Sequence, residues 1–172
     1  MDIFIEWMVK RKRNTVDYLK IAGCVLGLLV LIYFVLGFMG TPFGGIAFIV
    51  AAALVYVLYR VVMGTNIEFE YCFTNGALDV DKIINVQRRK RLAELNARKI
   101  DIMASANHSE YRRYLENSEI KKIYACIEPE SEGIYFAVYS DDNGRKMLLF
   151  NPNNEIKEGF KKFNPQKVFL DD

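Results

Sequence analysis

Residues 21–63 read IAGCVLGLLVLIYFVLGFMGTPFGGIAFIVAAALVYVLYRVVM, and residues 21–59 contain no Asp, Glu, Lys or Arg. A membrane-spanning helix needs roughly 20 apolar residues, so this stretch is too long for a single span. Residues 40–45 divide it with three glycines and one proline, which are turn-forming residues. We therefore expect two antiparallel transmembrane helices, at 21–39 and 46–63, joined by a short turn.

Basic residues flank this uncharged stretch on both sides, whereas the connecting turn carries no charge. Cytoplasmic segments of membrane proteins are enriched in Lys and Arg, so we expect both termini and the C-terminal region on the cytoplasmic side of the cell membrane. A cleaved signal peptide is disfavoured, because the first apolar segment is too long and a second follows at once. The flanking residues are Lys10, Arg11, Lys12, Arg13 and Lys20 before the stretch, and Arg60, Lys82, Arg88, Arg89, Lys90 and Arg91 at its end and beyond.

The two spans have the composition of an anchor. Their only ionisable side chain of the Asp, Glu, Lys or Arg type is the terminal Arg60, whereas transport paths usually need polar groups inside the membrane. Gly23 and Gly27 are four residues apart, a spacing that allows close helix contact within the hairpin or in a dimer.

The N-terminal segment, residues 1–20, allows two interpretations. Ile3, Phe4, Trp7 and Met8 would share one face of a helix, and a basic run follows, as in a helix lying at the membrane surface. Alternatively the terminus is frayed, or Trp7 packs against the soluble domain. The sequence alone does not choose between them.

Residues 64–172 have the pattern of a separate α+β domain, with 17 Lys and Arg against 18 Asp and Glu. Apolar residues alternate with polar ones over 67–73, which predicts a half-buried strand. Asn75-Gly76 is a hairpin turn, and 77–84 returns as the next strand. Further strands are expected at 89–95 and 99–103 around an Asn96-Ala97 turn, and at 120–127, 133–140 and 145–150, with a short helix at 108–117.

The chain closes with an amphipathic helix, in which Ile156, Phe160 and Phe163 recur on one face before Asn164-Pro165 ends it. About seven strands in successive hairpins, capped by one helix, make a pleckstrin-homology-like antiparallel sheet. The domains are therefore expected at 1–20, 21–63 and 64–172.

Three stretches also resemble a family of bacterial membrane proteins: FTNGALDVDKII at 73–84, RRKR at 88–91 and LLFNPN at 148–153. That family pairs an N-terminal transmembrane hairpin with a cytoplasmic domain similar to bacterial pleckstrin-homology domains. It has no assigned activity, so the resemblance implies a fold and transfers no functional residues.

Catalytic, metal and cofactor chemistry finds little support. The one histidine, His108, has no sequence context of a catalytic triad, and Cys24, Cys72 and Cys126 form no CxxC pair. Nucleotide-binding glycine motifs are absent from the sequence. The carboxylate pairs at 79 and 81 and at 141 and 142 are typical of solvated strands and turns. We expect a protein that is not an enzyme, has no cofactor or metal and binds no nucleic acid, because the domain is nearly neutral.

The basic run is the strongest functional candidate. We expect a non-enzymatic, membrane-anchored binding module that contacts anionic lipid or a protein partner at the inner leaflet. Two alternatives stay open: the run only sets topology, or the chain is an accessory or scaffold subunit of a larger membrane complex. The candidate lipid contacts are Arg88, Arg89, Lys90 and Arg91, with Arg98 and Lys99 expected to approach them across the second hairpin.

Overall fold

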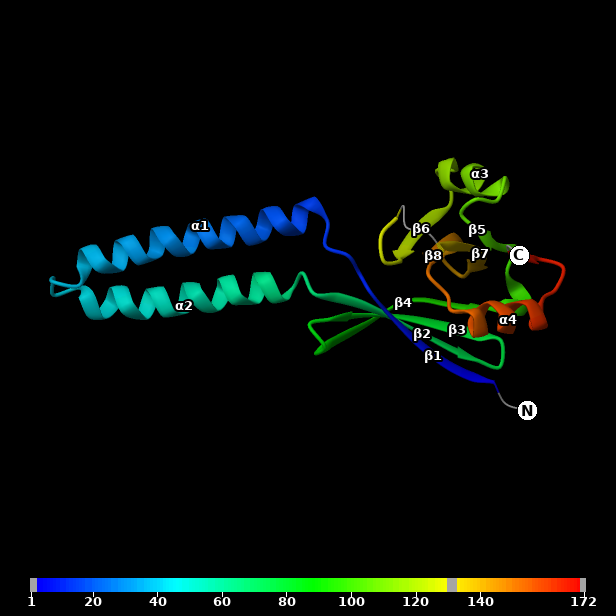
Figure 1. Ribbon diagram of the computed structural model, residues 1–172, viewed down its shortest axis with the longest axis horizontal. Helices are drawn as coiled ribbons and strands as arrows, with labels where there is room; N and C mark the ends of the chain where they lie inside the picture. The colour runs from blue at the N-terminus through cyan, green and yellow to red at the C-terminus, as the bar shows by residue number, and fades with distance from the viewer. Residues whose placement is uncertain (1–2, 130–132, 171–172) are drawn as a thin grey trace. The chain divides into compact units, whose positions relative to one another are not determined.

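The computed structural model describes residues 3–129 and 133–170 (Figure 1). The chain divides into two compact units: residues 13–67 form one, and residues up to 12 join those from 68 onward in the other. The expected N-terminal segment 1–20 is thus shared between the two units.

The first unit is a pair of helices, α1 (Thr15–Phe38) and α2 (Gly44–Met63). Both are long and apolar enough to cross a membrane. Helix α1 begins six residues before Ile21 because Asn14 and Asp17 form a capping box: the Asn14 side chain accepts the Asp17 N–H at 3.0 Å, and the Asp17 carboxylate accepts the Asn14 N–H at 3.2 Å. The predicted break at 40–45 is confirmed.

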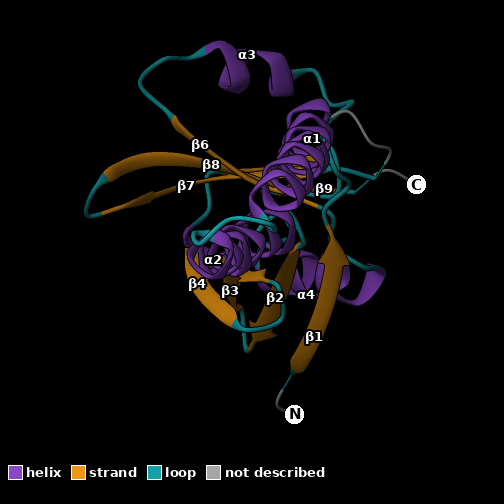
Figure 2. Ribbon diagram, turned by 90° about the vertical axis from the view of Figure 1, so that its left-hand side faces the viewer, coloured by secondary structure: helices purple, strands orange, loops and turns teal. Residues whose placement is uncertain are grey.

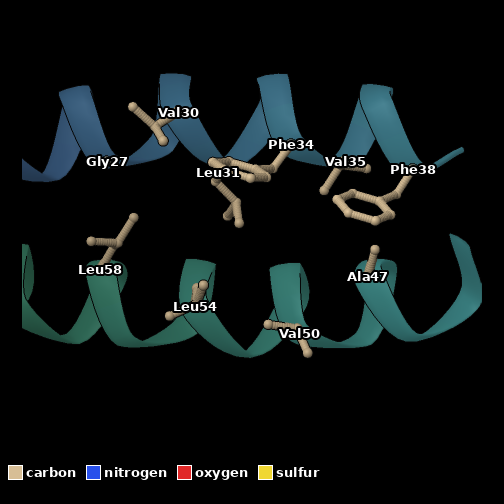
Figure 3. A pocket seen from close by; sticks show the side chains of 10 residues that line it. All are labelled: Gly27, Val30, Leu31, Phe34, Val35, Phe38, Ala47, Val50, Leu54 and Leu58. Carbon is tan, nitrogen blue, oxygen red and sulfur yellow. The ribbon is translucent and has the colours of Figure 1, made fainter. Parts of the chain in front are cut away.

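An apolar groove of about 510 Å³ runs between α1 and α2 (Figure 3). Gly27 lies in this groove, where an added Cβ would meet only Leu58 Cδ2 at 4.0 Å, and a Cβ on Gly23 would meet nothing within 4 Å. Of the two roles that this spacing allows, close contact within the hairpin is therefore not seen at either glycine.

The second unit contains a four-stranded sheet in the order β1 (Phe4–Lys10), β2 (Ile67–Thr74), β3 (Ala77–Ile84), β4 (Arg88–Asn96). The predicted strands at 67–73 and 77–84 are confirmed, and so is their turn, where Asn75 and Gly76 have φ of 49° and 95°.

Of the interpretations left open for the N-terminal segment, the surface helix is wrong, because residues 4–10 form strand β1. It pairs antiparallel with β2 from Phe4 opposite Thr74 to Lys10 opposite Glu68. Asn75 anchors its start: its side chain accepts the Ile3 N–H at 3.0 Å, and its own N–H donates to the Ile3 carbonyl at 3.0 Å. Strand β2 would otherwise leave backbone groups unpaired along this edge, and pairing with β1 satisfies them.

The remaining strands form a five-stranded sheet in the order β6-β8-β7-β5-β9. The described residues thus contain nine strands in two sheets, where about seven in successive hairpins were expected, and β6 with β8 and β5 with β9 are parallel. Figure 2 shows the strands of the two sheets as separate groups. The bounds are β5 (Ile102–Ser105), α3 (Glu110–Glu116), β6 (Lys121–Ala125), β7 (Tyr135–Asp141), β8 (Gly144–Phe150), α4 (Asn154–Phe163) and β9 (Val168–Phe169).

The predicted hairpin between 89–95 and 99–103 is wrong. Strand β4 ends in a 3-10 turn, Ala97–Lys99, and the chain then enters the second sheet. There the Asp101 N–H donates to the Val138 carbonyl at 2.7 Å, and the Met103 N–H donates to the Lys167 carbonyl at 2.8 Å. These distant partners replace the neighbouring strand.

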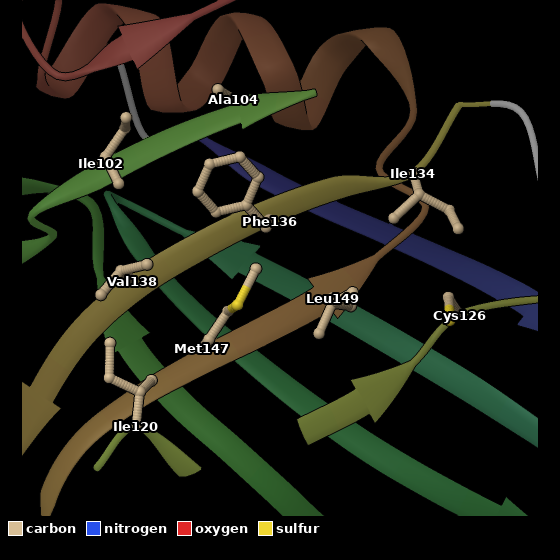
Figure 4. Packing of buried hydrophobic residues seen from close by; sticks show 9 residues of the cluster. All are labelled: Ile102, Ala104, Ile120, Cys126, Ile134, Phe136, Val138, Met147 and Leu149. Carbon is tan, nitrogen blue, oxygen red and sulfur yellow. The ribbon is translucent and has the colours of Figure 1, made fainter. Parts of the chain in front are cut away.

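Aromatic residues of both sheets meet at α4. The Phe160 ring lies 5.0 Å from that of Phe73 on β2 and 6.3 Å from that of Phe150 on β8, so the predicted amphipathic helix covers residues of both sheets. Tyr71 also links them, because its hydroxyl donates to the Ala125 carbonyl. A second apolar cluster fills the other side of the five-stranded sheet around Phe136 (Figure 4).

Candidate functional site

The basic run Arg88–Arg91 begins strand β4, directly after the turn that joins it to β3. Strand β3 starts next to Gly76, where an added Cβ would lie 3.2 Å from the ring of Phe163, the last residue of α4. The β3–β4 turn is at the other end of β3, and therefore at the end of the sheet remote from Phe163. Successive side chains of a strand point to opposite faces, so the run divides into two pairs.

One pair, Arg89 and Arg91, is held by carboxylates of the same sheet. Arg89 contacts both oxygens of Glu70, at 2.8 and 2.6 Å, and lies 3.7 Å from Asp81. Arg91 contacts Asp79 at 3.2 Å and Asp81 at 3.4 Å. These two guanidinium groups therefore neutralise acidic side chains of β2 and β3, although both side chains are more than half exposed.

The electrostatics of this pair follow from burial. Glu70 is only 6% exposed, and desolvation raises its pKa above the usual range, although the nearby Arg89 opposes the rise. Desolvation likewise raises the pKa of Asp79, with Arg91 acting in the opposite direction. The two arginines therefore reduce the free-energy cost of keeping these desolvated carboxylates ionised.

The other pair, Arg88 and Lys90, is exposed on the opposite face. Neither side chain makes an ion pair or hydrogen bond with any residue in the described ranges. Their cross-strand neighbours on β3 are Ile84 and Lys82, so no carboxylate stands directly opposite them. This pair is the part of the basic run whose charge is not compensated by a carboxylate of the described residues.

An exposed apolar residue tops the same hairpin. Val86 is 76% exposed and has a φ of 59°, next to Asn85 at 51°. The sequence reasoning missed this residue; an apolar side chain in the turn directly before the basic run was the available signal.

Arg98 and Lys99 do not join Arg88 and Lys90. They lie beyond the far end of β4, so the expectation of one six-residue cluster is wrong, because the second hairpin does not form. The Arg98 guanidinium covers the Phe163 ring at 5.1 Å. Lys99 borders a polar cleft of about 610 Å³, which Arg91 also borders.

The other sequence candidates have local roles. His108 accepts the Glu110 N–H at 3.3 Å, and its ring lies 5.1 Å from that of Phe169. Cys126 is buried, and desolvation raises its pKa to about 11. Within residues 3–129 and 133–170, no three His, Cys, Asp or Glu residues form a group that fits a metal ion.

The fold and this surface define an α+β protein in which two apolar helices accompany a pleckstrin-homology-like domain. The family model described as "Bacterial PH-like domain (DUF6106)" matches residues 1–170, and the chain belongs to this family. This confirms the resemblance seen in the sequence. Searches of curated proteins and of solved structures found no match.

Proposed function

We propose that this protein is a non-enzymatic, membrane-anchored module that binds anionic lipid headgroups. Helices α1 and α2 span the cell membrane as its anchor, and both termini and the pleckstrin-homology-like domain lie in the cytoplasm. Two observations support this proposal: two consecutive helices have the length and composition of spans, and the family's domain type suggests a binding module.

The division of the basic run carries the proposal. All four side chains are exposed, but Arg89 and Arg91 are held by carboxylates, whereas the side chains of Arg88 and Lys90 have no partner among the described residues. Each Lys or Arg near an anionic membrane surface contributes about 1 kcal/mol of attraction. Two such residues contribute about 2 kcal/mol and are expected to favour anionic over neutral lipid by about thirtyfold at low salt.

The test uses the full chain, because β1 belongs to the sheet and a fragment starting at residue 64 would lack it. The protein is held in neutral detergent with phosphatidylglycerol or phosphatidylcholine, and retained lipid is counted by native mass spectrometry across a salt series. We expect retention of phosphatidylglycerol that falls as salt rises, with at least a fivefold loss in Arg88→Ala/Lys90→Ala.

The matched control is Arg112→Ala/Lys162→Ala. It removes the same two charges from exposed side chains that have no polar contact within the described residues. This variant should retain lipid as the parent does. Equal retention by the parent and by Arg88→Ala/Lys90→Ala would overturn the proposal.

A further inference from the structure

The β3–β4 turn has a backbone conformation that does not suit its sequence. Asn85 and Val86 are both in the left-handed region, with φ of 51° and 59°. Asn adopts this conformation readily, but a β-branched residue there is strained. In the β2–β3 turn of the same sheet, the two positions with positive φ are Asn75 at 49° and Gly76 at 95°, and glycine adopts this conformation without strain.

Valine at this position also gains nothing from packing, because it is 76% exposed. Stability therefore does not explain its presence. Strain kept at an exposed position is typical of residues that act outside the folded core. From this we infer that Val86 inserts into the apolar layer of the bilayer, just below the headgroups that Arg88 and Lys90 contact, an inference that rests on the proposed function.

The topology places the β3–β4 turn at the end of the sheet that is connected to α1 and α2. Strand β1 ends at Lys10 opposite Glu68, where β2 begins. Strands β2 and β3 have eight residues each and are joined by a two-residue turn, so the last residue of β3 lies level with the first residue of β2. The β3–β4 turn therefore projects from the sheet end at which the chain enters from α2 and leaves for α1.

Chain length then limits how far this end lies from the membrane. Only residues 64–66 separate α2 from β2, so the four steps from Met63 to Ile67 reach at most about 14 Å. This limit holds for any orientation of the two units. With α2 spanning the membrane, this upper limit leaves the lipid headgroups within reach of the sheet end.

The spacing along the hairpin matches the layers of a bilayer. Two residues of a strand cover about 6.6 Å, which is the order of the distance from Arg88 to the turn residue Val86. The headgroup region adds roughly 5–7 Å on each side of the hydrocarbon core. An arginine at the phosphates therefore places the valine at the edge of the acyl chains.

The experiment uses the unmodified full chain in vesicles of phosphatidylcholine with phosphatidylglycerol. The phosphatidylglycerol carries a photoreactive diazirine on its acyl chain, close to the glycerol. After irradiation, trypsin releases residues 83–88 as one peptide, because Lys82 and Arg88 flank the cleavage sites. Lipid adducts on this peptide are quantified by mass spectrometry against the peptide that contains the Asn143 turn of β7 and β8.

We expect adducts on residues 83–88 at least fivefold above those on the Asn143 peptide. Val86→Asn should lower them at least threefold, and Val86→Ile should retain them. Asn tolerates the left-handed conformation, so loss in that variant is not a consequence of misfolding.

Three outcomes would overturn the insertion. Adducts unchanged in Val86→Asn would mean that Val86 is not the inserted group. Phosphatidylglycerol retention that depends on Arg88 and Lys90, without acyl adducts at 83–88, would show a surface contact alone and leave the proposed function standing. Absence of both the adducts on 83–88 and the phosphatidylglycerol retention that depends on Arg88 and Lys90 would overturn the insertion and the proposed function together. The exposed valine would then be assigned to a protein contact.

Discussion

Replacing Arg89 with Ala should destabilise the four-stranded sheet, because it removes the partner of an almost fully buried carboxylate. The Glu70 side chain is 7% exposed and contacts Arg89 at 2.6 Å, and Asp81 lies 3.7 Å from the same guanidinium. The variant leaves Glu70 without a counter-ion at the centre of the sheet. Arg88→Ala, one residue earlier on the same strand, is the matched control, since the Arg88 side chain has no ionic or hydrogen-bond partner among the described residues.

The structure also limits the size of the effect. Removing one member of a buried ion pair costs about 3–5 kcal/mol. The Arg89 side chain is 58% exposed, however, so solvent screens the pair and water can reach the carboxylate after substitution. We therefore expect a loss of about 1–2 kcal/mol in the free energy of unfolding of this domain, or about 4–8 °C in its melting temperature.

The loss should depend on pH with a defined sign. Burial raises the pKa of Glu70 above 4.5, and Arg89 opposes this rise, so the variant raises the pKa further. Below pH 4.5 the carboxyl is protonated in folded and unfolded chains alike, and this contribution to the difference between parent and variant vanishes. As the pH rises through and above 4.5, the folded variant must ionise an unpaired carboxyl, and the difference grows to its full value.

Urea unfolding of the full chain in detergent measures this difference at pH 4 and pH 7.5. Trp7, the only tryptophan, lies on β1 and reports the opening of the sheet by its fluorescence. Adding Glu70→Gln to Arg89→Ala should restore part of the stability. The reasoning fails if Arg89→Ala and Arg88→Ala unfold at the same urea concentration at pH 7.5, or if the loss is the same at both pH values.

Four further predictions use the same unfolding measurement or simple labelling. Tyr71→Phe should cost about 1–3 kcal/mol, because it removes a buried hydroxyl that bonds across the two sheets. Gly159→Ala should cost about 1–3 kcal/mol, since its Cβ would lie 2.7 Å from Phe73 Cε1; an unchanged midpoint would contradict this packing. Val86→Gly should stabilise the domain by about 1 kcal/mol by relieving the left-handed valine. Cys126 should resist alkylation at pH 8 until urea unfolds the chain, because burial raises its pKa to about 11.

Local patterns predicted the local elements well. The uncharged stretch predicted α1 and α2, period-two alternation and Asn75-Gly76 predicted β2, β3 and their turn, and the spacing of apolar residues predicted α4. Each of these signals lies within one segment of chain, because a span, a hairpin or an amphipathic helix is defined by its own residues. The family resemblance came from the same segments.

Pairing between distant segments could not be predicted in this way. Residues 4–10 form a strand by pairing with the edge of β2, which lies more than 55 residues further along the chain. Residues 102–105 pair with β7 and β9 instead of with β4. The basic run shows the same limit for the candidate site. Four adjacent cations are equivalent in the sequence, but strand geometry turns Arg89 and Arg91 toward carboxylates of β2 and β3 and leaves the side chains of Arg88 and Lys90 without an ionic partner among the described residues. Composition and periodicity thus determined the two apolar helices and individual elements of the domain. The tertiary structure decided which strands pair and which charges are paired, because both depend on groups brought together from distant parts of the chain.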